Sequence, residues 1–344
     1  MYALELGGED DAFAALEARS VAPDDAVVAP GLAAAPAVDA DRAPGLAYTR
    51  AVSRLVGRTD ASIPGARAVV EAAEGVTGTV AVHARDVRKS AGVDTQAAER
   101  ELGQALVAAG GEVDLDDPDE VLRAAFADDV CLVGWQVATR EGGYGARRPT
   151  ERPFFQPGGM DPLDARALVN VAGARPGARL LDPMCGTGGT LIEAGLVRAE
   201  VVGVDAQAKM VRGARENCRA YLDVDPLLCR GDATALPLAD GACDAVVFDA
   251  PYGRQSKVVG DLADLVSGAL REARRVAPRA VVVADESLEP AAEAAGWTVK
   301  ARHERRVHRS LVRHVHVLDA GPTGERTRET EGGERRDPPE GRRA

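Results

Sequence analysis

The stretch LLDPMCGTGGT, residues 180–190, joins a short apolar run to a glycine-rich turn and then to a helical pattern. Glycines let the backbone pass close beneath a ligand, and the first turn of a helix offers N–H groups that have no partner within the helix. The stretch therefore predicts a strand, a ligand-binding turn and a helix, as in the first unit of a nucleotide-binding α/β fold.

Two common nucleotide sites do not fit this glycine turn. Gly186 and Gly188 occupy the first and third places of the dinucleotide fingerprint GxGxxG, but Leu191 stands where its last glycine belongs. No GKS or GKT follows, which excludes a phosphate-cradling P-loop. Asp182, directly before the turn, suits a ligand with an amino group better than one with a pyrophosphate.

Around this stretch, short apolar runs alternate with helical stretches, which is typical of βαβ units and of a parallel sheet covered on both faces. Two later apolar runs, at 298–302 and 311–318, predict closing strands at an antiparallel edge. The expected fold is a doubly wound, Rossmann-like α/β sheet. Its parallel strands are expected at 179–181, 201–204, 227–229, 245–248 and 280–284, and its helices near 188–199, 207–221, 258–276 and 288–295.

Acidic side chains stand at the ends of successive predicted strands. Asp205 ends the second strand, where a carboxylate can accept both hydroxyls of a ribose. Asp232 follows the third strand, where it could meet an adenine amino group. Each acid alone could be a helix cap. Because doubly wound sheets bind ligands at the carboxyl ends of their strands, Asp182, Asp205 and Asp232 together predict a cofactor crevice.

The fourth strand ends in DAPYG, residues 249–253. With the glycine turn and the strand-end acids, this motif resembles the class I S-adenosylmethionine-dependent methyltransferases, and among them the group that methylates amino nitrogens. That group carries an Asp or Asn, two prolines and an aromatic residue. Ala250 replaces the first proline and keeps the backbone carbonyl. The resemblance implies S-adenosylmethionine as cofactor and no metal.

The same resemblance implies a role for each residue of the motif. An exocyclic amine on a base is a poor nucleophile because its lone pair is delocalised into the ring. The Asp249 carboxylate and the Ala250 carbonyl would accept its two N–H groups and hold the nitrogen in line with the methyl group. Pro251 would stiffen the turn, and Tyr252 would stack on a flipped-out base.

A second set of motifs narrows the resemblance. RPFFQPGGM at 152–160, ARALVN at 165–170 and MVRG at 210–213 are similar to segments of the archaeal tRNA (guanine-10 N2) methyltransferases, and the similarity covers roughly 140–318. In that family the segment before the first strand packs over the methionine part of the cofactor. The alternative is that Phe154 and Phe155 fill a domain junction. The implied cofactor-binding residues are Phe155, Pro157, Asp182, Pro183, Gly186, Thr187, Gly188, Asp205, Asp232 and Ala233.

The first 138 residues predict a smaller mixed α/β region. VRKS at 87–90, the helix after Asp94 and GEVDLDDPD at 111–119 resemble a THUMP domain, an RNA-binding module that grips tRNA near its acceptor end. The acidic run could equally be a strand followed by an aspartate-rich helix cap. Strands are expected near 2–6, 79–83 and 130–137, helices near 9–19, 48–56, 94–109 and 118–127, and phosphate contacts at Arg85, Arg88, Lys89, Arg147, Arg148 and Arg152.

Changes in composition divide the chain. Glycine and proline gather between 139 and 162, which is typical of an interdomain connection. From about residue 321 almost nothing is apolar, so this segment cannot bury a core. The expected parts are an N-terminal RNA-binding region at 1–138, a linker at 139–162, a class I methyltransferase domain at 163–320 and a disordered tail at 321–344.

The composition is that of a soluble globular protein, with 45% hydrophobic and 28% charged residues among 344. The net charge of −12 opposes simple electrostatic binding of nucleic acid, and 38 of the 42 basic residues are arginine. Abundant acid with little lysine favours a protein from a halophile, which would bind RNA through shape, stacking and bidentate arginine contacts. Codon bias in a GC-rich genome explains the arginines but not the excess of acid.

The five cysteines form no CxxC pair and no zinc-like spacing, so we expect reduced core residues and no metal. No run of about 20 apolar residues predicts a membrane span. The N-terminus lacks the pattern of a signal peptide, which predicts a cytoplasmic protein. The sequence leaves the oligomeric state open and favours a monomer.

These features predict an enzyme that transfers methyl from S-adenosylmethionine to the N2 amine of guanine 10 in tRNA, once or twice. The same chemistry at tRNA position 6 or in ribosomal RNA is an alternative. Adenine-N6 methylation of nucleic acid is another, although no target-recognition domain of a DNA methyltransferase is visible. A catalytically silent RNA-binding protein and a nicotinamide oxidoreductase are rival classes, and calorimetry of cofactor binding separates them.

Overall fold

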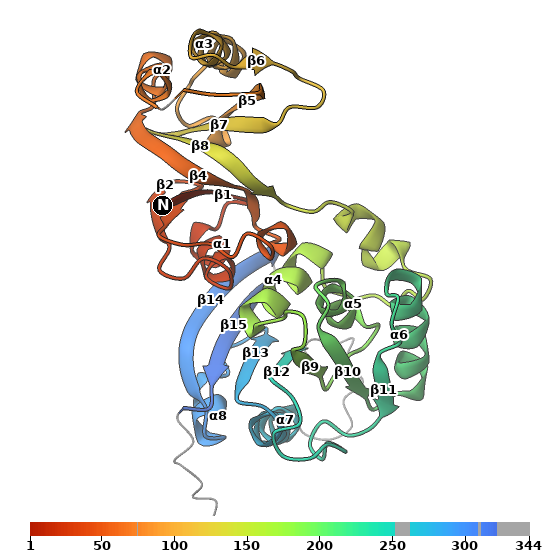
Figure 1. The fold of residues 1–344 in the computed structure, drawn as a ribbon. Coiled ribbons are helices and arrows are strands. Elements are labelled where there is room, and N and C mark those ends of the chain that lie inside the picture. The colour runs from red at the N-terminus through yellow and green to blue at the C-terminus, as the bar shows by residue number, and fades with distance from the viewer. Residues whose placement is uncertain (74, 252–261, 309–310, 322–344) are drawn as a thin grey trace, which may run out of the picture.

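The structure, a computed structural model, describes residues 1–73, 75–251, 262–308 and 311–321. Within these residues the chain forms two β-sheets, one from residues 2–139 and the other from residues 179–319 (Figure 1). None of the described helices has the length and apolar content that a membrane span requires. Short 3-10 helices lie at η1 (Ala43–Gly45), η2 (Val87–Lys89), η3 (Tyr144–Arg147) and η4 (Pro149–Glu151).

The C-terminal sheet has the strand order β11-β10-β9-β12-β13-β15-β14. The first five of these strands are parallel, and β15 runs antiparallel to both β13 and β14. The prediction of a doubly wound sheet with an antiparallel edge is confirmed. The strand order reverses between β9 and β12, where such sheets bind ligands. The strands are β9 (Arg179–Asp182), β10 (Glu200–Asp205), β11 (Leu227–Arg230), β12 (Ala245–Asp249), β13 (Arg279–Ala284), β14 (Thr298–His308) and β15 (Leu311–Asp319).

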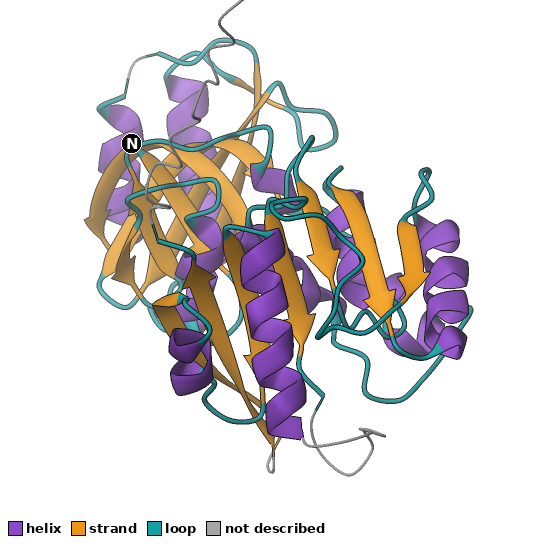
Figure 2. Ribbon diagram, turned by 90° about the horizontal axis from the view of Figure 1, so that it is seen from below, coloured by secondary structure: helices purple, strands orange, loops and turns teal. Residues whose placement is uncertain are grey.

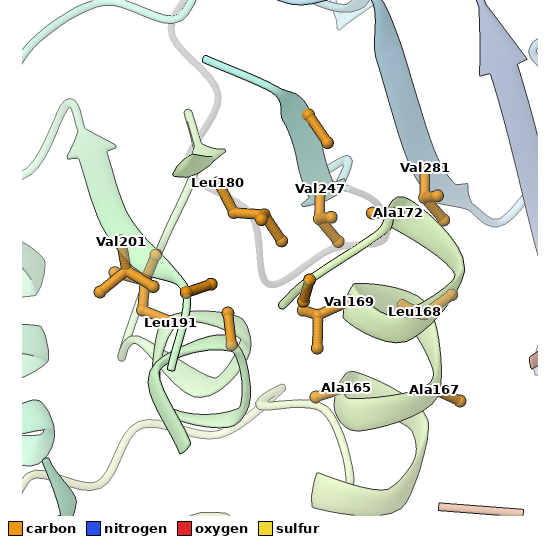
Figure 3. Packing of buried hydrophobic residues seen from close by; sticks show 14 of the residues in the cluster. Ala165, Ala167, Leu168, Val169, Ala172, Leu180, Leu191, Val201, Val247 and Val281 are labelled. Carbon is orange, nitrogen blue, oxygen red and sulfur yellow. The ribbon is translucent and has the colours of Figure 1, made fainter. Parts of the chain in front are cut away.

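Helices cover both faces of this sheet because its central strands are apolar on both sides. Val247 belongs to a core with residues of α4 and α5 (Figure 3), whereas Val246 and Phe248 pack with residues of α7 on the other face. Figure 2 shows helices in front of and behind the strands. These helices are α4 (Pro162–Ala172), α5 (Gly189–Leu196), α6 (Ala208–Tyr221), α7 (Leu262–Val276) and α8 (Glu289–Ala294).

Helix α4 is the one helix of this sheet that the sequence analysis does not predict. It begins after Asp161, whose carboxylate accepts the N–H of Leu163 at 2.9 Å, and it ends at Gly173, whose φ of 96° lies in the left-handed region. The predicted helices near 188–199, 207–221 and 288–295 are confirmed as α5, α6 and α8, and α7 confirms the described part of the helix near 258–276. The predicted tail lies outside the described residues, except for Gly321.

The N-terminal sheet has the strand order β2-β3-β1-β4-β8-β7-β5-β6. It is antiparallel except at β5, which is parallel to both β6 and β7. Helices α2 and α3 pack on one face through a core that includes Val70, Leu102 and Phe126. The elements are β1 (Tyr2–Leu6), α1 (Asp11–Ala18), β2 (Ala26–Ala29), β3 (Leu32–Ala35), β4 (Thr49–Asp60), α2 (Ile63–Glu71), β5 (Thr79–Asp86), α3 (Thr95–Ala108), β6 (Glu112–Val113), β7 (Glu120–Ala127) and β8 (Val130–Thr139).

Two predicted helices of this region are wrong. The segments 48–56 and 118–127 form β4 and β7, each of which pairs with a strand on both sides. Their alanines and leucines favour a helix locally, but pairing within the sheet outweighs this small preference. The sequence analysis also misses β2, β3 and α2. The strands near 2–6, 79–83 and 130–137 and the helices near 9–19 and 94–109 are confirmed as β1, β5, β8, α1 and α3.

The acidic run at 111–119 forms β6 and a turn, so the alternative of an aspartate-rich helix cap is wrong. Asp114 accepts the N–H groups of Asp116 at 2.9 Å and Asp117 at 3.1 Å, which closes the turn. Asp119 then accepts the N–H of Thr79 at 2.9 Å. The run therefore ties β6 and β7 to the start of β5.

Polar contacts join the two sheets. Glu17 on α1 is fully buried, and its carboxylate accepts the N–H of Tyr48 at 2.6 Å and the side-chain amide of Asn170 on α4 at 2.7 Å. Arg305 on β14 pairs with Asp164 at 2.7 Å, and its guanidinium carbon lies 4.9 Å from the centre of the Tyr48 ring. These contacts hold the N-terminal residues against α4 and β14.

Candidate active site

Three of the predicted acids lie at the carboxyl ends of adjacent parallel strands. Asp182 ends β9, Asp205 ends β10 and Asp249 ends β12, and β9 pairs with both of the other strands. The charges of Asp205 and Asp249 both raise the pKa of Asp182, so each of these two carboxyl groups is within electrostatic range of Asp182. The structure therefore brings these acids together at one edge of the sheet.

Asp182 is the most deeply buried of the three, with 4% of its surface exposed. Its carboxylate accepts the N–H of Met184 at 3.0 Å and the hydroxyl of Thr190. Burial raises the pKa of Asp182 to about 7, against the opposing effect of these two hydrogen bonds. Asp182 thus closes the turn between β9 and α5 and holds a proton up to neutral pH.

Changing Asp182 to Asn is expected to flatten the pH dependence of stability. Because the native pKa is about 7 and the ordinary value 3.8, the native state holds a proton that the unfolded state has already lost between these values. The free energy of unfolding therefore falls as pH rises across this window, by about 1.4 kcal/mol per pH unit at most. Urea unfolding at about pH 5 and about pH 8 measures the fall. An equal fall in the wild type and in Asp182→Asn would contradict the raised pKa.

Asp205 holds the glycine turn from the neighbouring strand. One carboxylate oxygen accepts the N–H of Gly186 at 3.0 Å, and the other accepts the N–H of Gln207 at 2.8 Å. Gly186 and Gly188 have φ values of 51° and 81°, which explains why glycines stand there. Since each carboxylate oxygen has a second lone pair, Asp205 can still accept two hydroxyl groups from a ligand.

Asp232 lies beyond the end of β11, exposed to solvent. Its carboxylate accepts both the N–H and the hydroxyl of Thr234 at 2.8 Å, so Asp232 closes a turn and does not cap a helix. The neighbouring Gly231 donates its N–H to the carbonyl of Asp205 at 3.1 Å, which places this turn beside β10. Ala233 is buried there.

The segment 152–160 lies against the glycine turn and α6. The side-chain amide of Asn217 on α6 donates to the carbonyls of both Phe154 and Thr187 at 2.9 Å. The Phe154 ring occupies the space over Gly213, where even a Cβ atom would lie 2.0 Å from it. Phe155 is 49% exposed, and Pro157 is exposed as well.

The DAPYG motif follows β12 at the same edge of the sheet. Asp249 is half-buried, and Ala250 is buried and donates its N–H to the carbonyl of Val283 on β13 at 2.8 Å. This bond holds the backbone at the position of the replaced proline. Pro251 is half-buried, and Tyr252 lies outside the described residues.

The sequence analysis misses Arg313 on β15, which contacts the motif. Its guanidinium Nη2 lies 3.4 Å from Asp249 Oδ2, and the Arg313 side chain is only 9% exposed. A signal was present, because the alternation in β15 puts Arg313 in phase with the buried Val315. A buried arginine in an apolar strand requires a nearby acceptor.

Most of the residues predicted to contact phosphate instead form hydrogen bonds or ion pairs within the chain. Arg88 binds the Asp11 carboxylate and the Gly8 carbonyl, and Arg85 pairs with Glu5 at 3.3 Å. The structure contradicts the prediction most clearly for Arg147 and Arg152. Arg147 pairs with the buried Glu193 at 2.7 Å, and Arg152 is 4% exposed and donates to the Arg147 carbonyl. Lys89 and Arg148 are exposed.

The cysteines fit the sequence prediction with one exception. Four of them are buried, as expected, but Cys229 on the edge strand β11 is exposed. Among the described residues, no group of three or more His, Cys, Asp or Glu side chains is arranged to hold a metal ion.

Comparisons with known proteins agree with this geometry. Residues 149–315 match the family model described as RMKL-like, methyltransferase domain. The tRNA (guanine(10)-N2)-dimethyltransferase of Methanothermobacter thermautotrophicus is 34% identical over 286 residues, which cover 79% of this chain and 83% of that protein. The enzyme of the same name from Pyrococcus abyssi is 31% identical over 251 residues, which cover 71% of this chain and 75% of that protein.

More distant similarities extend beyond the archaea. The U6 snRNA (guanine-N(2))-methyltransferase THUMPD2 of Mus musculus is 30% identical over 186 residues, or 53% of this chain and 33% of that protein. The crystal structure of TrmN from Thermus thermophilus superposes with a TM-score of 0.48 at 23% identity, over 92% of this chain and 99% of TrmN. The coverage and identity of the archaeal relatives show that this chain belongs to the tRNA (guanine(10)-N2)-dimethyltransferase family.

Proposed function

We propose that this protein transfers methyl from S-adenosylmethionine to the exocyclic N2 amine of guanine 10 in tRNA. The names of the archaeal relatives support this substrate. The observation that carries the proposal is the position of Asp249, next to β9 and in electrostatic range of Asp182. A carboxylate that can accept an amine N–H thus lies beside a crevice suited to the cofactor.

The donor set of the crevice fits S-adenosylmethionine. When bound, this cofactor supplies an electrophilic methyl group on a positively charged sulfur. Asp205 would accept the ribose hydroxyls, and the Asp205 and Asp249 carboxylates would favour the positive charge. Asp232 and Ala233 would receive the adenine, while Phe155 and Pro157 would cover the methionine part. Close approach of the backbone is provided by the turn residues Asp182, Pro183, Gly186, Thr187 and Gly188.

The amine is held by the motif after β12. Asp249 and the Ala250 carbonyl accept its two N–H groups and orient the nitrogen toward the methyl group. The Asp249 charge also stabilises the amine as it becomes cationic during transfer. Pro251 restricts the turn, and Tyr252 serves as the stacking surface for the flipped-out guanine.

Arg313 acts in this reaction as a positioning residue. Changing Arg313 to Met is expected to lower kcat by about 10-fold and to leave cofactor affinity unchanged, because the guanidinium orients Asp249 and does not meet the ligand. The acid limb of the kcat profile should also move to higher pH, since a carboxylate without its cation binds protons more readily. Arg313→Lys keeps the charge and should restore the pH profile. A profile that does not move in Arg313→Met would contradict the role.

In this proposal the N-terminal part binds the RNA. Residues 1–138 then contain a THUMP-type RNA-binding region, 139–162 form the linker and 163–320 carry the catalytic domain. The separate sheets and the resemblance at 87–119 support this division. The buried contacts of Glu17 and Arg305 support a fixed position of the RNA-binding part relative to the catalytic crevice.

Product analysis tests the proposal. The purified protein is incubated at high salt with labelled S-adenosylmethionine and unmodified tRNA, and the nucleosides are separated after digestion. The expected product is N2-methylguanosine, its dimethyl form, or both. Methylated adenosine, or product with ribosomal RNA and none with tRNA, would contradict the proposed substrate.

A further inference from the structure

A basic groove lies near the starts of the parallel strands of the C-terminal sheet. Asp182, Asp205 and Asp249 lie at the opposite, carboxyl ends of these strands. The groove is a cavity of about 350 Å³ between the ends of α1 and α4 and the starts of β13 and β14. Its charged lining consists of Arg19, Arg42, Arg175, Arg279, Lys300 and Asp319. The lining thus has five basic residues and one acidic residue, whereas the whole chain has a net charge of −12. The groove is therefore positively charged in an acidic protein.

Three of these cations have partners that explain them as parts of the fold. Arg42 donates to the carbonyls of Ser20 at 2.9 Å and Ala174 at 3.3 Å, near the carboxyl ends of α1 and α4. Cations at such ends stabilise a helix. Arg175 donates to the Gly173 carbonyl at 3.1 Å, and Arg19 pairs with Asp25 at 2.8 Å. The remaining two, Arg279 and Lys300, are different.

In the described part of the chain, neither the Arg279 nor the Lys300 side chain forms a hydrogen bond or an ion pair. Asp319 stands opposite Arg279 in the sheet, but its carboxylate accepts the N–H of Gly321 at 2.9 Å. The guanidinium groups of Arg279 and Arg175 converge, since their Nη1 atoms lie 3.2 and 3.6 Å from the place that a Cβ of Gly173 would take. Two guanidinium groups that lie close together, neither of them in an ion pair among the described residues, attract an anion.

A further hydrogen-bonding group lies in the same lining. The hydroxyl oxygen of Ser20 is buried and has no hydrogen-bond partner among the described residues. Guanidinium groups, an ammonium group and a hydroxyl are the donors that bind phosphate oxygens. The cationic donors of the groove therefore fit a phosphate group.

We propose that this groove binds a backbone phosphate of the RNA substrate, an inference that rests on the proposed function. Arg279 begins β13, and four residues further along Val283 pairs with Asp249. At about 3.3 Å per residue, the groove and the catalytic acid are about 13 Å apart along the strand, which one RNA molecule can span. Contact at both ends of the strand anchors the RNA while its target base enters the crevice.

Charge reversal at the two unpartnered cations tests the proposal. Arg279→Glu and Lys300→Glu remove no side-chain hydrogen bond or ion pair among the described residues. The control Arg271→Glu makes the same charge change at an exposed site on α7, on the opposite face of the sheet. The Kd for unmodified tRNA is measured by fluorescence anisotropy over a range of salt. Each groove variant should raise the Kd by about 3- to 10-fold and lower the slope of log K against log salt by about 1, whereas the control should do neither.

The outcomes separate the groove from the proposed function. Suppose that the unaltered protein binds tRNA and that Arg279→Glu and Lys300→Glu have the wild-type Kd and the wild-type salt slope. This result would contradict the role of the groove and leave the proposed function standing. A titration with inorganic phosphate, followed by phosphorus NMR, examines the other source of the same chemistry. Phosphate binding that is lost in the variants while tRNA affinity is kept would assign the groove to a free anion and overturn the RNA contact. Failure of the unaltered protein to bind tRNA would contradict the proposed function instead.

Discussion

Changing Asp249 to Ala is expected to lower kcat by at least about 100-fold while the Kd for S-adenosylmethionine stays within a few-fold of the wild type. The carboxylate is needed most as the amine becomes cationic, which begins in the transition state and not in the bound substrate. In the proposed site, β9, β10 and the segments around them would hold the cofactor, and Asp249 stands at the end of the next strand, β12. Single-turnover kinetics and isothermal calorimetry measure the two quantities separately.

Matched variants sharpen the test of Asp249. Asp249→Asn keeps the shape and one acceptor oxygen, so it should retain more activity than Asp249→Ala and much less than the wild type. Ala250→Pro restores the proline usual in amino methyltransferases, but the N–H that Ala250 donates to Val283 at 2.8 Å would be lost. If Asp249→Ala abolished cofactor binding, Asp249 would belong to the cofactor site and the assignment would be wrong.

Changing Asp205 to Ala is expected to weaken S-adenosylmethionine binding by at least about 100-fold, because hydrogen bonds to a charged group contribute about 1.5–3 kcal/mol each. The variant loses the acceptors for the ribose hydroxyls. It also leaves the N–H groups of Gly186 and Gln207 without the carboxylate that they now contact at 3.0 and 2.8 Å. Calorimetric titration measures the loss, and kcat at saturating cofactor should change less than the Kd.

Asp232→Ala is the natural comparison for Asp205→Ala. Asp232 is exposed and hydrogen-bonded to Thr234, so removing its carboxylate should raise the Kd for S-adenosylmethionine by about 10-fold at most. A cofactor affinity that is lowered more by Asp232→Ala than by Asp205→Ala would reverse the two assignments. Circular dichroism of both variants checks that neither substitution has unfolded the domain.

The catalytic sheet could be predicted from the sequence because its strands are short apolar runs buried on both faces. Val246 and Val247 in β12 face opposite cores, so the run is apolar without alternation, and turn residues bound it. The N-terminal sheet could not be predicted in the same way. β4 is a strand because it lies between β1 and β8, and these neighbours are far away in the chain. Local preference carries no information about such pairing.

The same distinction applies to the site. Asp182, Asp205 and Asp249 could be predicted because the end of a parallel strand is a position that the sequence reveals. Arg313 reaches Asp249 across 64 residues of chain, and only the register of β12, β13 and β15 brings them together. The basic groove also depends on the topology, since Arg279 begins β13 and Lys300 lies near the start of β14. Residues whose role depends on strand register remain hidden until the fold is known.

We expect the methyl acceptor to be the exocyclic amine of guanine 10, held by Asp249 and the Ala250 carbonyl. Inosine has the ring of guanosine without that amine, so a tRNA with inosine at position 10 tests the claim directly. Methyl transfer from labelled S-adenosylmethionine is compared for this tRNA and for one that differs only in having guanosine there. The account predicts incorporation into the guanosine tRNA and none above background into the inosine tRNA. Equal incorporation into both would contradict it.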